Sequence, residues 1–137
     1  MEIEYVDGFP QPYPLMDAES YWQACARQEL TYQRCTSCGQ PCWPARSHCP
    51  DCGTRTLEWQ RSAGRGTVYS FSTVGRGPTP AWQEIAPYTV GFVELEEGYF
   101  LFTQIDAPPE SIAIGDRVEV AFIRRGRQML PVFRPRG

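Results

Sequence analysis

Two copies of a short cysteine pattern constrain the fold of this chain more than any other feature. Cys35 and Cys38 enclose two residues, and Cys49 and Cys52 repeat this spacing ten residues later, each pair being followed by glycine. Two such pairs complete a tetrahedral four-cysteine metal site of the zinc-ribbon type. Because a closed site of four thiolates has no open coordination position, we expect a structural ion, zinc, without hydrolytic activity. A rubredoxin-type iron centre uses the same four ligands, so iron is the alternative metal for this site.

A redox role is the rival interpretation of the cysteines. A redox C-x2-C pair normally occurs once, at a helix start after a strand, whereas this chain has two matched copies. Of the two further cysteines, we expect Cys25 in the core and Cys42 as a small buried residue. The acidic N-terminus resembles no signal peptide, and no apolar run is long enough to span a membrane. We therefore expect a cytoplasmic protein with metal-bound or free thiols.

The basic residues exclude several kinds of catalysis. All 13 of them are arginine, so the chain has no Schiff-base lysine, no P-loop lysine and no Ser–Lys dyad. His48 is the only histidine, and its place directly before Cys49 favours an exposed side chain or a donor near the metal. We expect no catalytic residues, and hence a binding or subunit role.

The chain divides into three expected parts. Residues 1–33 form a proline-rich extended arm and a docking helix over residues 18–30, with Asp17 as its N-cap. Residues 34–60 form the four-cysteine zinc ribbon. Residues 61–137 hold about five β-branched and aromatic strands, at 66–74, 90–95, 99–105, 117–123 and 130–133. The expected fold is therefore mainly β, with an N-terminal helix, a rubredoxin-like zinc ribbon and a C-terminal five-stranded OB-fold barrel.

Two details of the barrel segment add to this prediction. Residues 75–87, with three prolines, indicate a long loop, and Gly98 should take the positive-φ position of a hairpin. The segment Tyr99–Phe102 is apolar on both faces, which suits a barrel whose outer wall is partly covered.

A nucleic-acid-binding role is the first alternative function, because zinc ribbons and OB barrels often bind nucleic acid. The charge argues against it, since the net charge is −3 and the pI about 5.2. The arginines gather in the C-terminal part, where residues 61–137 carry 9 Arg and 8 acids. A solvated basic surface explains them as well as a phosphate-binding patch does.

The ordered motifs resemble one family. They are Cys35-x2-Cys38-Gly39, Cys49-Pro-x-Cys52-Gly53, Gly66-Thr-Val-Tyr-Ser-Phe, the stretch from Pro87 to Gly98, and Gly115-Asp-x-Val-x-Val-x-Phe122. This order resembles the acyl-CoA-associated proteins with a rubredoxin-like zinc ribbon and an OB-fold, long catalogued as a domain of unknown function. The resemblance covers roughly residues 17–135.

The resemblance implies a non-catalytic accessory subunit of a thiolase-superfamily enzyme. Such partners include acetyl-CoA acyltransferases and the steroid side-chain aldolases, which cleave a steroid-CoA by retro-aldol chemistry. It also implies a two-plus-two assembly with the thiolase-like enzyme, in which acyl-CoA is bound through the complex. A stand-alone acyl-CoA-binding protein is the second alternative.

Only the four metal ligands carry over from the family residue by residue. For a partner interface, chemistry favours large apolar side chains of the arm, the helix and the 75–87 loop. These candidates are Phe9, Tyr13, Tyr21, Trp22, Trp82, Ile85 and Tyr88, with Trp43 as a further one. If CoA phosphates touch this chain, the arginines expected nearest the ribbon–barrel junction are Arg46, Arg65 and Arg76.

Overall fold

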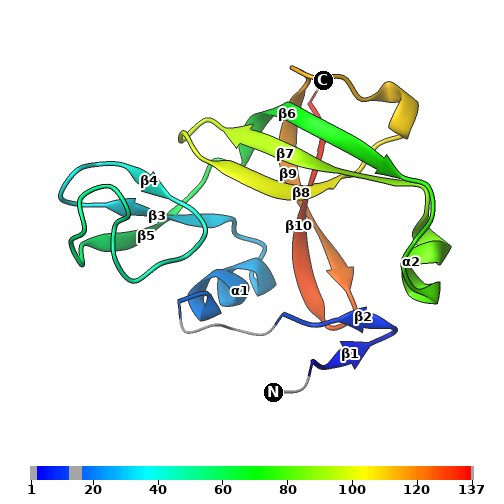
Figure 1. Cartoon of the computed structure of the whole chain (residues 1–137), viewed down its shortest axis with the longest axis horizontal. Coiled ribbons are helices and arrows are strands. Elements are labelled where there is room, and N and C mark those ends of the chain that lie inside the picture. The colour runs from blue at the N-terminus through cyan, green and yellow to red at the C-terminus, as the bar shows by residue number, and fades with distance from the viewer. Residues whose placement is uncertain (1–2, 13–16, 137) are drawn as a thin grey trace.

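The computed structural model describes residues 3–12 and 17–136, and it confirms the mainly β architecture (Figure 1). A small three-stranded sheet at one end carries the cysteines, a closed five-stranded barrel forms the other end, and one helix lies beside both. Among the described residues, no helix has the length and apolar character needed to cross a membrane.

The barrel closes through strands β6 (Arg65–Val74), β7 (Tyr88–Leu95), β8 (Phe100–Ile105), β9 (Arg117–Arg125) and β10 (Gln128–Pro135). Their order around the barrel is β10-β8-β7-β6-β9, and only the β10–β8 pairing is parallel. A 3-10 turn, η1 (Pro109–Ser111), lies between β8 and β9. The predicted five strands are thus confirmed, although β9 and β10 pair over a longer stretch than their apolar residues indicated.

The barrel core is filled by the inward side chains of alternating positions. On β7, for example, Val93 and Leu95 are buried, while Phe92 and Glu94, which alternate with them, are exposed. Gly91 lies so close to the β6 backbone that a Cβ there would meet the carbonyl oxygen of Ser70. The predicted hairpin is confirmed, with Gly98 at a φ of 97°.

The second sheet has the order β4-β3-β5, from β3 (Thr31–Cys35), β4 (Pro41–Cys42) and β5 (Leu57–Arg61). Tyr32 on β3 stacks on Tyr99 of the barrel, with ring centroids 5.0 Å apart. This contact joins the ribbon to the barrel. Because β3 and β5 pair from Thr31 to Arg61, the sheet extends slightly beyond the 34–60 segment expected for the ribbon.

Helix α1 (Glu19–Ala26) is shorter than the predicted helix over 18–30. Its N-cap is Ala18, without a side-chain capping bond, so the prediction of Asp17 as the cap is wrong. The helix ends early because Gln28 takes a left-handed conformation with a φ of 61° and its N–H donates to the Cys25 carbonyl. The buried face of α1, including Tyr21 and Cys25, packs into the core as expected for a docked helix.

The N-terminal arm is a two-stranded hairpin, β1 (Tyr5–Val6) with β2 (Phe9–Pro10), rather than a single extended segment. It lies against the β9–β10 turn of the barrel. The side chain of Gln11 accepts a bond from the Arg127 N–H and donates to the Arg125 carbonyl. The arm therefore lies across the body of its own chain. Tyr13 lies outside the described residues.

The segment 75–87 contains a short helix, α2 (Pro80–Ile85), where the sequence indicated only a loop. Pro80 stands in the first turn, where its missing N–H costs no hydrogen bond. The Gln83 side chain closes the turn by accepting a bond from the Gly77 N–H, 2.9 Å away. The three prolines of this segment favoured a loop over a helix in the sequence-based prediction, although Pro80 is suited to start a helix.

Candidate functional site

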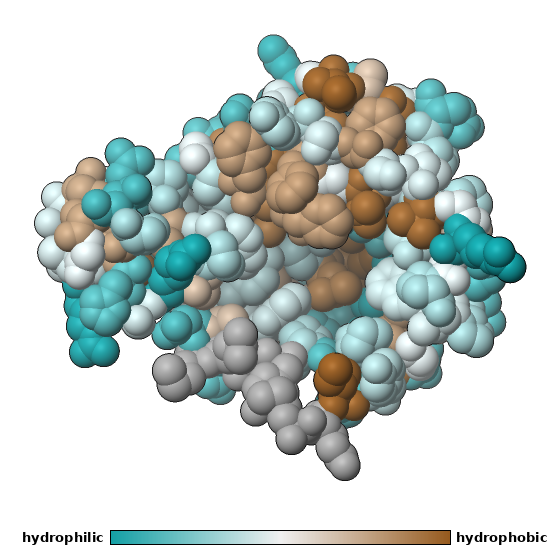
Figure 2. Space-filling model, in the orientation of Figure 1, coloured by the Kyte–Doolittle hydropathy of each residue, from teal (hydrophilic) through white to brown (hydrophobic). Residues whose placement is uncertain are grey.

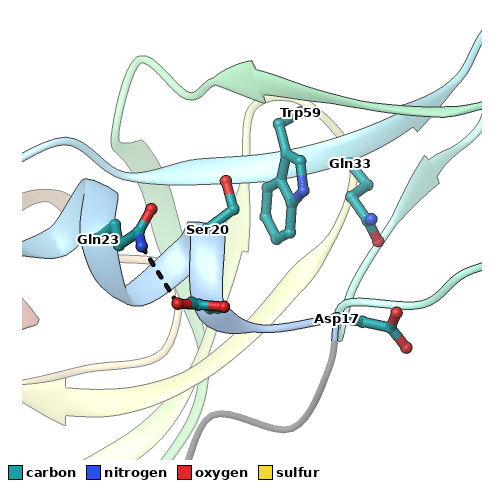
Figure 3. A pocket seen from close by; sticks show the side chains of 6 residues that line it. Asp17, Ser20, Gln23, Gln33 and Trp59 are labelled. Carbon is teal, nitrogen blue, oxygen red and sulfur yellow. Dashed lines mark hydrogen bonds between the residues drawn. The ribbon is translucent and has the colours of Figure 1, made fainter.

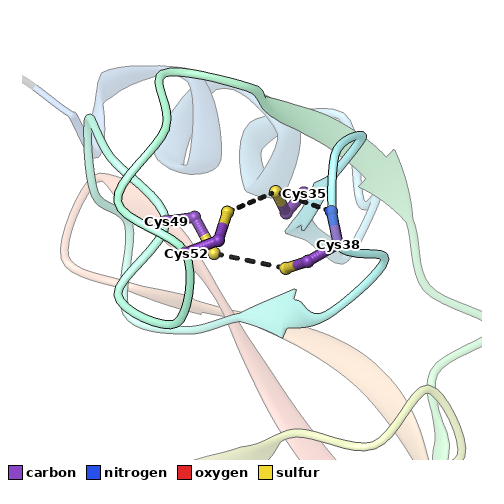
Figure 4. Close-up of side chains that lie close together, drawn as sticks. All are labelled: Cys35, Cys38, Cys49 and Cys52. Carbon is purple, nitrogen blue, oxygen red and sulfur yellow. Dashed lines mark hydrogen bonds between the residues drawn. The ribbon is translucent and has the colours of Figure 1, made fainter.

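The structure brings the four predicted metal ligands together in the ribbon (Figure 4). All four sulfur atoms lie within 4.8 Å of one another, and the Cys35–Cys52 and Cys38–Cys49 Sγ distances are both 3.6 Å. Four sulfurs around zinc at a bond length of about 2.3 Å would be about 3.8 Å apart. The thiols therefore fit a single tetrahedral metal ion without rearrangement.

The loops around the four cysteines follow from the glycines and the backbone. Gly39 and Gly53 have φ values of 79° and 77°, a left-handed conformation that glycine adopts without strain. Their N–H groups bond to the carbonyls of Cys35 and Cys49, the first cysteine of each pair. The Cys38 N–H donates to the Cys35 sulfur, as expected for an amide that stabilises a thiolate.

Two hydroxyl groups that the sequence analysis did not single out also reach the sulfurs. Thr56 lies 3.1 Å from the Cys35 sulfur and Thr54 lies 3.1 Å from the Cys52 sulfur. The bond from Thr56 lowers the pKa of Cys35 to about 5. The pKa of Cys52 is likewise lowered, chiefly by the bond from Thr54. Both contacts favour thiolates, which is the form that binds a metal.

The Cys38 thiol behaves differently from those of Cys35 and Cys52. The Gln40 N–H lowers the pKa of Cys38, but desolvation and hydrogen bonds with the neighbouring thiols raise it overall to about 12. Clustered thiols cannot all ionise next to one another, and a bound dication removes this repulsion. The donor set thus suits a metal cation better than free thiols.

The remaining cysteines and the histidine lie apart from this cluster. Cys25 and Cys42 are both buried, as predicted, and the Cys42 thiol donates to the Pro44 carbonyl. His48 is exposed, and its Nδ1 lies 2.9 Å from the Ser47 hydroxyl.

An apolar groove of about 570 Å³ lies between α1, the ribbon and the barrel. It gathers several of the side chains predicted for a partner interface from separate parts of the sequence: Tyr21, Trp22, Trp43, Trp82 and Tyr88. Tyr21 is only 4% exposed and belongs mainly to the core, whereas the other four are half-buried and form the walls. Apolar grooves of this size are typical of binding sites.

Arg125 also lines the groove, whereas the sequence placed it only among the C-terminal arginines of a possible phosphate-binding patch. Its guanidinium lies 5.1 Å from the Phe9 ring and 5.3 Å from the Trp82 ring, and it donates to Gln104 Oε1 at 2.7 Å. Burial lowers the pKa of Arg125. Its Nε has no hydrogen-bond partner among the described residues. The arginine thus joins the hairpin, α2 and the barrel on one side of the groove.

The other predicted residues that the structure describes are not part of the groove lining. Ile85 lines a smaller cavity of about 320 Å³, next to Tyr88 and Arg125. The three arginines proposed for CoA phosphates occupy separate environments. Arg46 lies in the loop between the cysteine pairs, Arg65 forms an ion pair with Glu96, and Arg76 lies in the loop before α2.

A polar hollow of about 390 Å³ separates α1 from the ribbon sheet (Figure 3). Its charged side chains are Asp17 and Glu19, and the Glu19 carboxylate accepts a 3.4 Å bond from Gln23. Ser20 is the only hydroxyl in its lining, and no residue of that lining could activate it as a base of the Ser–His type. This hollow therefore offers no nucleophilic catalysis.

Comparison with known proteins agrees with the two parts of the fold. Residues 22–58 match the family described as "ChsH2, rubredoxin-like zinc ribbon domain", and residues 59–122 match "ChsH2, C-terminal OB-fold domain". A "DUF35 domain-containing scaffold protein" of Methanothermobacter thermautotrophicus is 43% identical over 98 residues, covering 70% of this chain and 73% of that protein. This chain belongs to the DUF35 family of zinc-ribbon and OB-fold proteins.

Other relatives carry the names of enzyme subunits or of an enzyme complex. "Benzoylsuccinyl-CoA thiolase subunit BbsA" of Thauera aromatica is 33% identical and covers 72% of this chain and 68% of its own. A "Probable enoyl-CoA hydratase alpha subunit" of Thermomonospora curvata is 34% identical over 92% of this chain, which spans only 40% of that subunit. The solved "Ltp2-ChsH2(DUF35) aldolase" matches with 34% identity and a TM-score of 0.83, covering 91% of this chain and 98% of that one.

Proposed function

We propose that this DUF35 chain is a non-catalytic accessory subunit of a thiolase-superfamily acyl-CoA enzyme. The observation that carries the proposal is the match to the DUF35 chain of the aldolase complex over 98% of that chain. A thiolase subunit among the relatives supports the same role. A retro-aldol aldolase acting on a steroid-CoA side chain is our first candidate for the partner, and an acetyl-CoA acyltransferase is the second. We expect a two-plus-two assembly.

The chemistry of the chain supports an accessory role. It has no lysine, its one histidine is exposed, and the four clustered thiols would be saturated by a metal ion. The groove offers aromatic walls and a buried cation, Arg125, and its lining contains neither histidine nor cysteine. Such a surface can bind a partner enzyme and help to shape its acyl-CoA site, while the reacting groups would come from the partner.

The metal in this proposal is a structural zinc ion held by Cys35, Cys38, Cys49 and Cys52. When bound, the ion would supply folding energy to the ribbon rather than a reactive water, because all four positions are taken by thiolates. The six free cysteines agree with a reducing compartment, and we propose the cytoplasm.

The groove is the proposed contact with the partner and its acyl group. Trp22, Trp82 and Tyr88 would serve as its anchors, because aromatic side chains bury much area at little entropic cost. Phe9 packs edge-on against Trp82, with ring centroids 5.0 Å apart, and would hold it in place. Ile85 would extend the contact, and Arg46, Arg65 and Arg76 are proposed as contacts for CoA phosphates.

Affinity purification tests this proposal. The tagged chain should retain a thiolase-superfamily enzyme in near-stoichiometric amount from its host, and the reconstituted pair should cleave or transfer an acyl-CoA that neither component handles alone. Binding of acyl-CoA without any protein partner would instead support the stand-alone binder. Retention of nucleic acid, with an affinity that falls steeply with salt, would support the nucleic-acid alternative.

If the tagged chain retains no enzyme, no acyl-CoA and no nucleic acid, all three proposed functions are contradicted. A variant lacking one groove anchor, such as Trp82→Ala, should reduce the enzyme retained on the column. The Ile114→Ser variant serves as a control, because Ile114 is 71% exposed and lies outside the groove lining.

A further inference from the structure

The outer face of the barrel carries four exposed aromatic rings. Tyr69, Phe92, Phe100 and Phe102 are 60%, 43%, 43% and 59% exposed, and we call them the aromatic face. They come from the adjacent strands β6, β7 and β8. The rings pair edge-on: the Tyr69 and Phe100 ring centroids are 5.0 Å apart, and those of Phe92 and Phe102 are 5.2 Å apart. Figure 2 shows apolar residues gathered on the barrel above the hollowed middle of the molecule.

These rings lie outside the hydrophobic core of this chain. Phe100 and Phe102 flank the buried Leu101, and Phe92 precedes the buried Val93, so the rings occupy the outward positions of the alternation. Outward positions of an antiparallel sheet are usually polar. Four aromatic residues there therefore indicate a surface that another molecule covers.

The size of the aromatic face favours a larger contact that includes the groove. A free aromatic side chain presents roughly 150–250 Å², so these exposed fractions leave about 400 Å² of aromatic surface. A stable protein interface covers about 800 Å² on each partner. Phe102 belongs to both the aromatic face and the groove lining, so the two surfaces are continuous and together approach that size. A second copy covering only the aromatic face would bury too little for a stable dimer.

The charges around the aromatic face favour a protein over nucleic acid. The strands β7 and β8 form the usual ligand face of an OB barrel, where exposed aromatic rings can stack on bases. Here the outward neighbour is an acid, Glu94, which is directly opposite Phe100 in the strand register. The nearby Arg65 is engaged by Glu96, at 3.6 Å. In the strand register, Phe92 and Phe100 lie opposite Phe102 and Glu94 and not opposite a cation, an arrangement that favours an apolar protein surface over phosphates.

We propose that the aromatic face and the groove form one continuous docking surface for the thiolase-like enzyme. This inference rests on the proposed function and adds to it the face of the barrel that binds. The enzyme would supply an apolar patch over the four rings and a basic side chain opposite Glu94. The strands β6, β7 and β8 would then be buried between the two subunits.

The test compares single substitutions by calorimetric titration of this chain with the co-purifying enzyme. Phe92→Ser and Phe100→Ser should each raise the dissociation constant at least 10-fold, because buried aromatic residues dominate interface energies. Phe92→Tyr should stay close to the wild type. Ile114→Ser removes a more exposed apolar side chain from the loop before β9 and should change the constant less than 2-fold. Bound zinc and circular dichroism should match the wild type in every variant.

Each outcome separates the two ideas. If the wild-type chain binds the enzyme and the two serine variants bind equally well, the docking surface is wrong and the accessory role stands. If the wild type binds no such enzyme, both fail. A dimer of this chain, or binding to single-stranded DNA, that the Phe100→Ser variant abolishes would also overturn the inference, by assigning the aromatic face to another occupant.

Discussion

Replacing Cys38 with serine tests the metal site and its effect on the fold together. The sulfur distances of 3.6 Å in the cluster match one tetrahedral ion, so each cysteine supplies a quarter of the coordination shell. Structural zinc sites bind with about 10–16 kcal/mol, which gives about 3 kcal/mol per ligand. The Cys38→Ser variant should therefore bind zinc more than 100-fold more weakly.

The loop between the cysteine pairs should unfold with the loss of metal. It contains only short secondary structure, and its buried side chains are mainly Cys42 and Cys49. Few apolar contacts remain to hold it once the ion is absent. Because the chain has no lysine, trypsin can cut between Cys35 and Leu57 only after Arg46, in this loop, and after Arg55, just beyond Cys52. Both sites should become sensitive in the variant.

The assay is a competition for zinc with a chromophoric chelator, followed by limited trypsin digestion. Cys42→Ser is the matched control. Cys42 is a buried thiol of the same loop whose bond to the Pro44 carbonyl a serine can also make. It should keep its zinc and its resistance to trypsin. Wild-type zinc affinity in Cys38→Ser, or an equal loss in Cys42→Ser, would refute the assignment of the ligands.

Three further variants test other parts of the structure. Thr56→Val removes the hydroxyl bound to the Cys35 sulfur and should weaken zinc binding about 10-fold in the same competition; an unchanged affinity would show that the contact is incidental. Trp82→Ala should raise the dissociation constant for the partner enzyme about 30-fold, measured by calorimetry, and an unchanged constant would leave Trp82 a packing role. Gly91→Ala forces a Cβ against the β6 backbone and should lower the melting temperature by about 3–9 °C in calorimetric scans, whereas Gly75→Ala, with open space around it, should not.

The metal ligands and the strands were predictable because their signals are local. The cysteine pairs and their glycines lie close together in sequence, so spacing alone defines the cluster. The barrel strands are rich in β-branched and aromatic residues, and Gly98 identifies a turn by its own conformation. The exposure of Phe100 and Phe102 was also indicated by the sequence, because the segment Tyr99–Phe102 is apolar on both faces.

The features that the sequence did not show depend on distant contacts. The burial of Arg125 requires Phe9, Trp82 and Gln104, three residues from three separate elements. Thr56 reaches the Cys35 sulfur only because β3 and β5 pair. Helix α1 ends at Ala26 because the chain must turn into β3, although apolar spacing continues to Leu30. Tertiary structure decides each of these positions, and local propensity does not.

The position of Trp43 gives the metal site a consequence for the groove. Trp43, Pro44 and Ala45 form one wall of the groove, and all three lie in the loop between the two cysteine pairs. The Trp43 ring packs against Tyr21 of α1, with centroids 4.5 Å apart, so this wall also contacts the helix opposite. An ion that closes the four thiolates fixes both ends of that loop and hence the wall. A structural metal would thus influence binding, since it would hold the surface on which a partner docks.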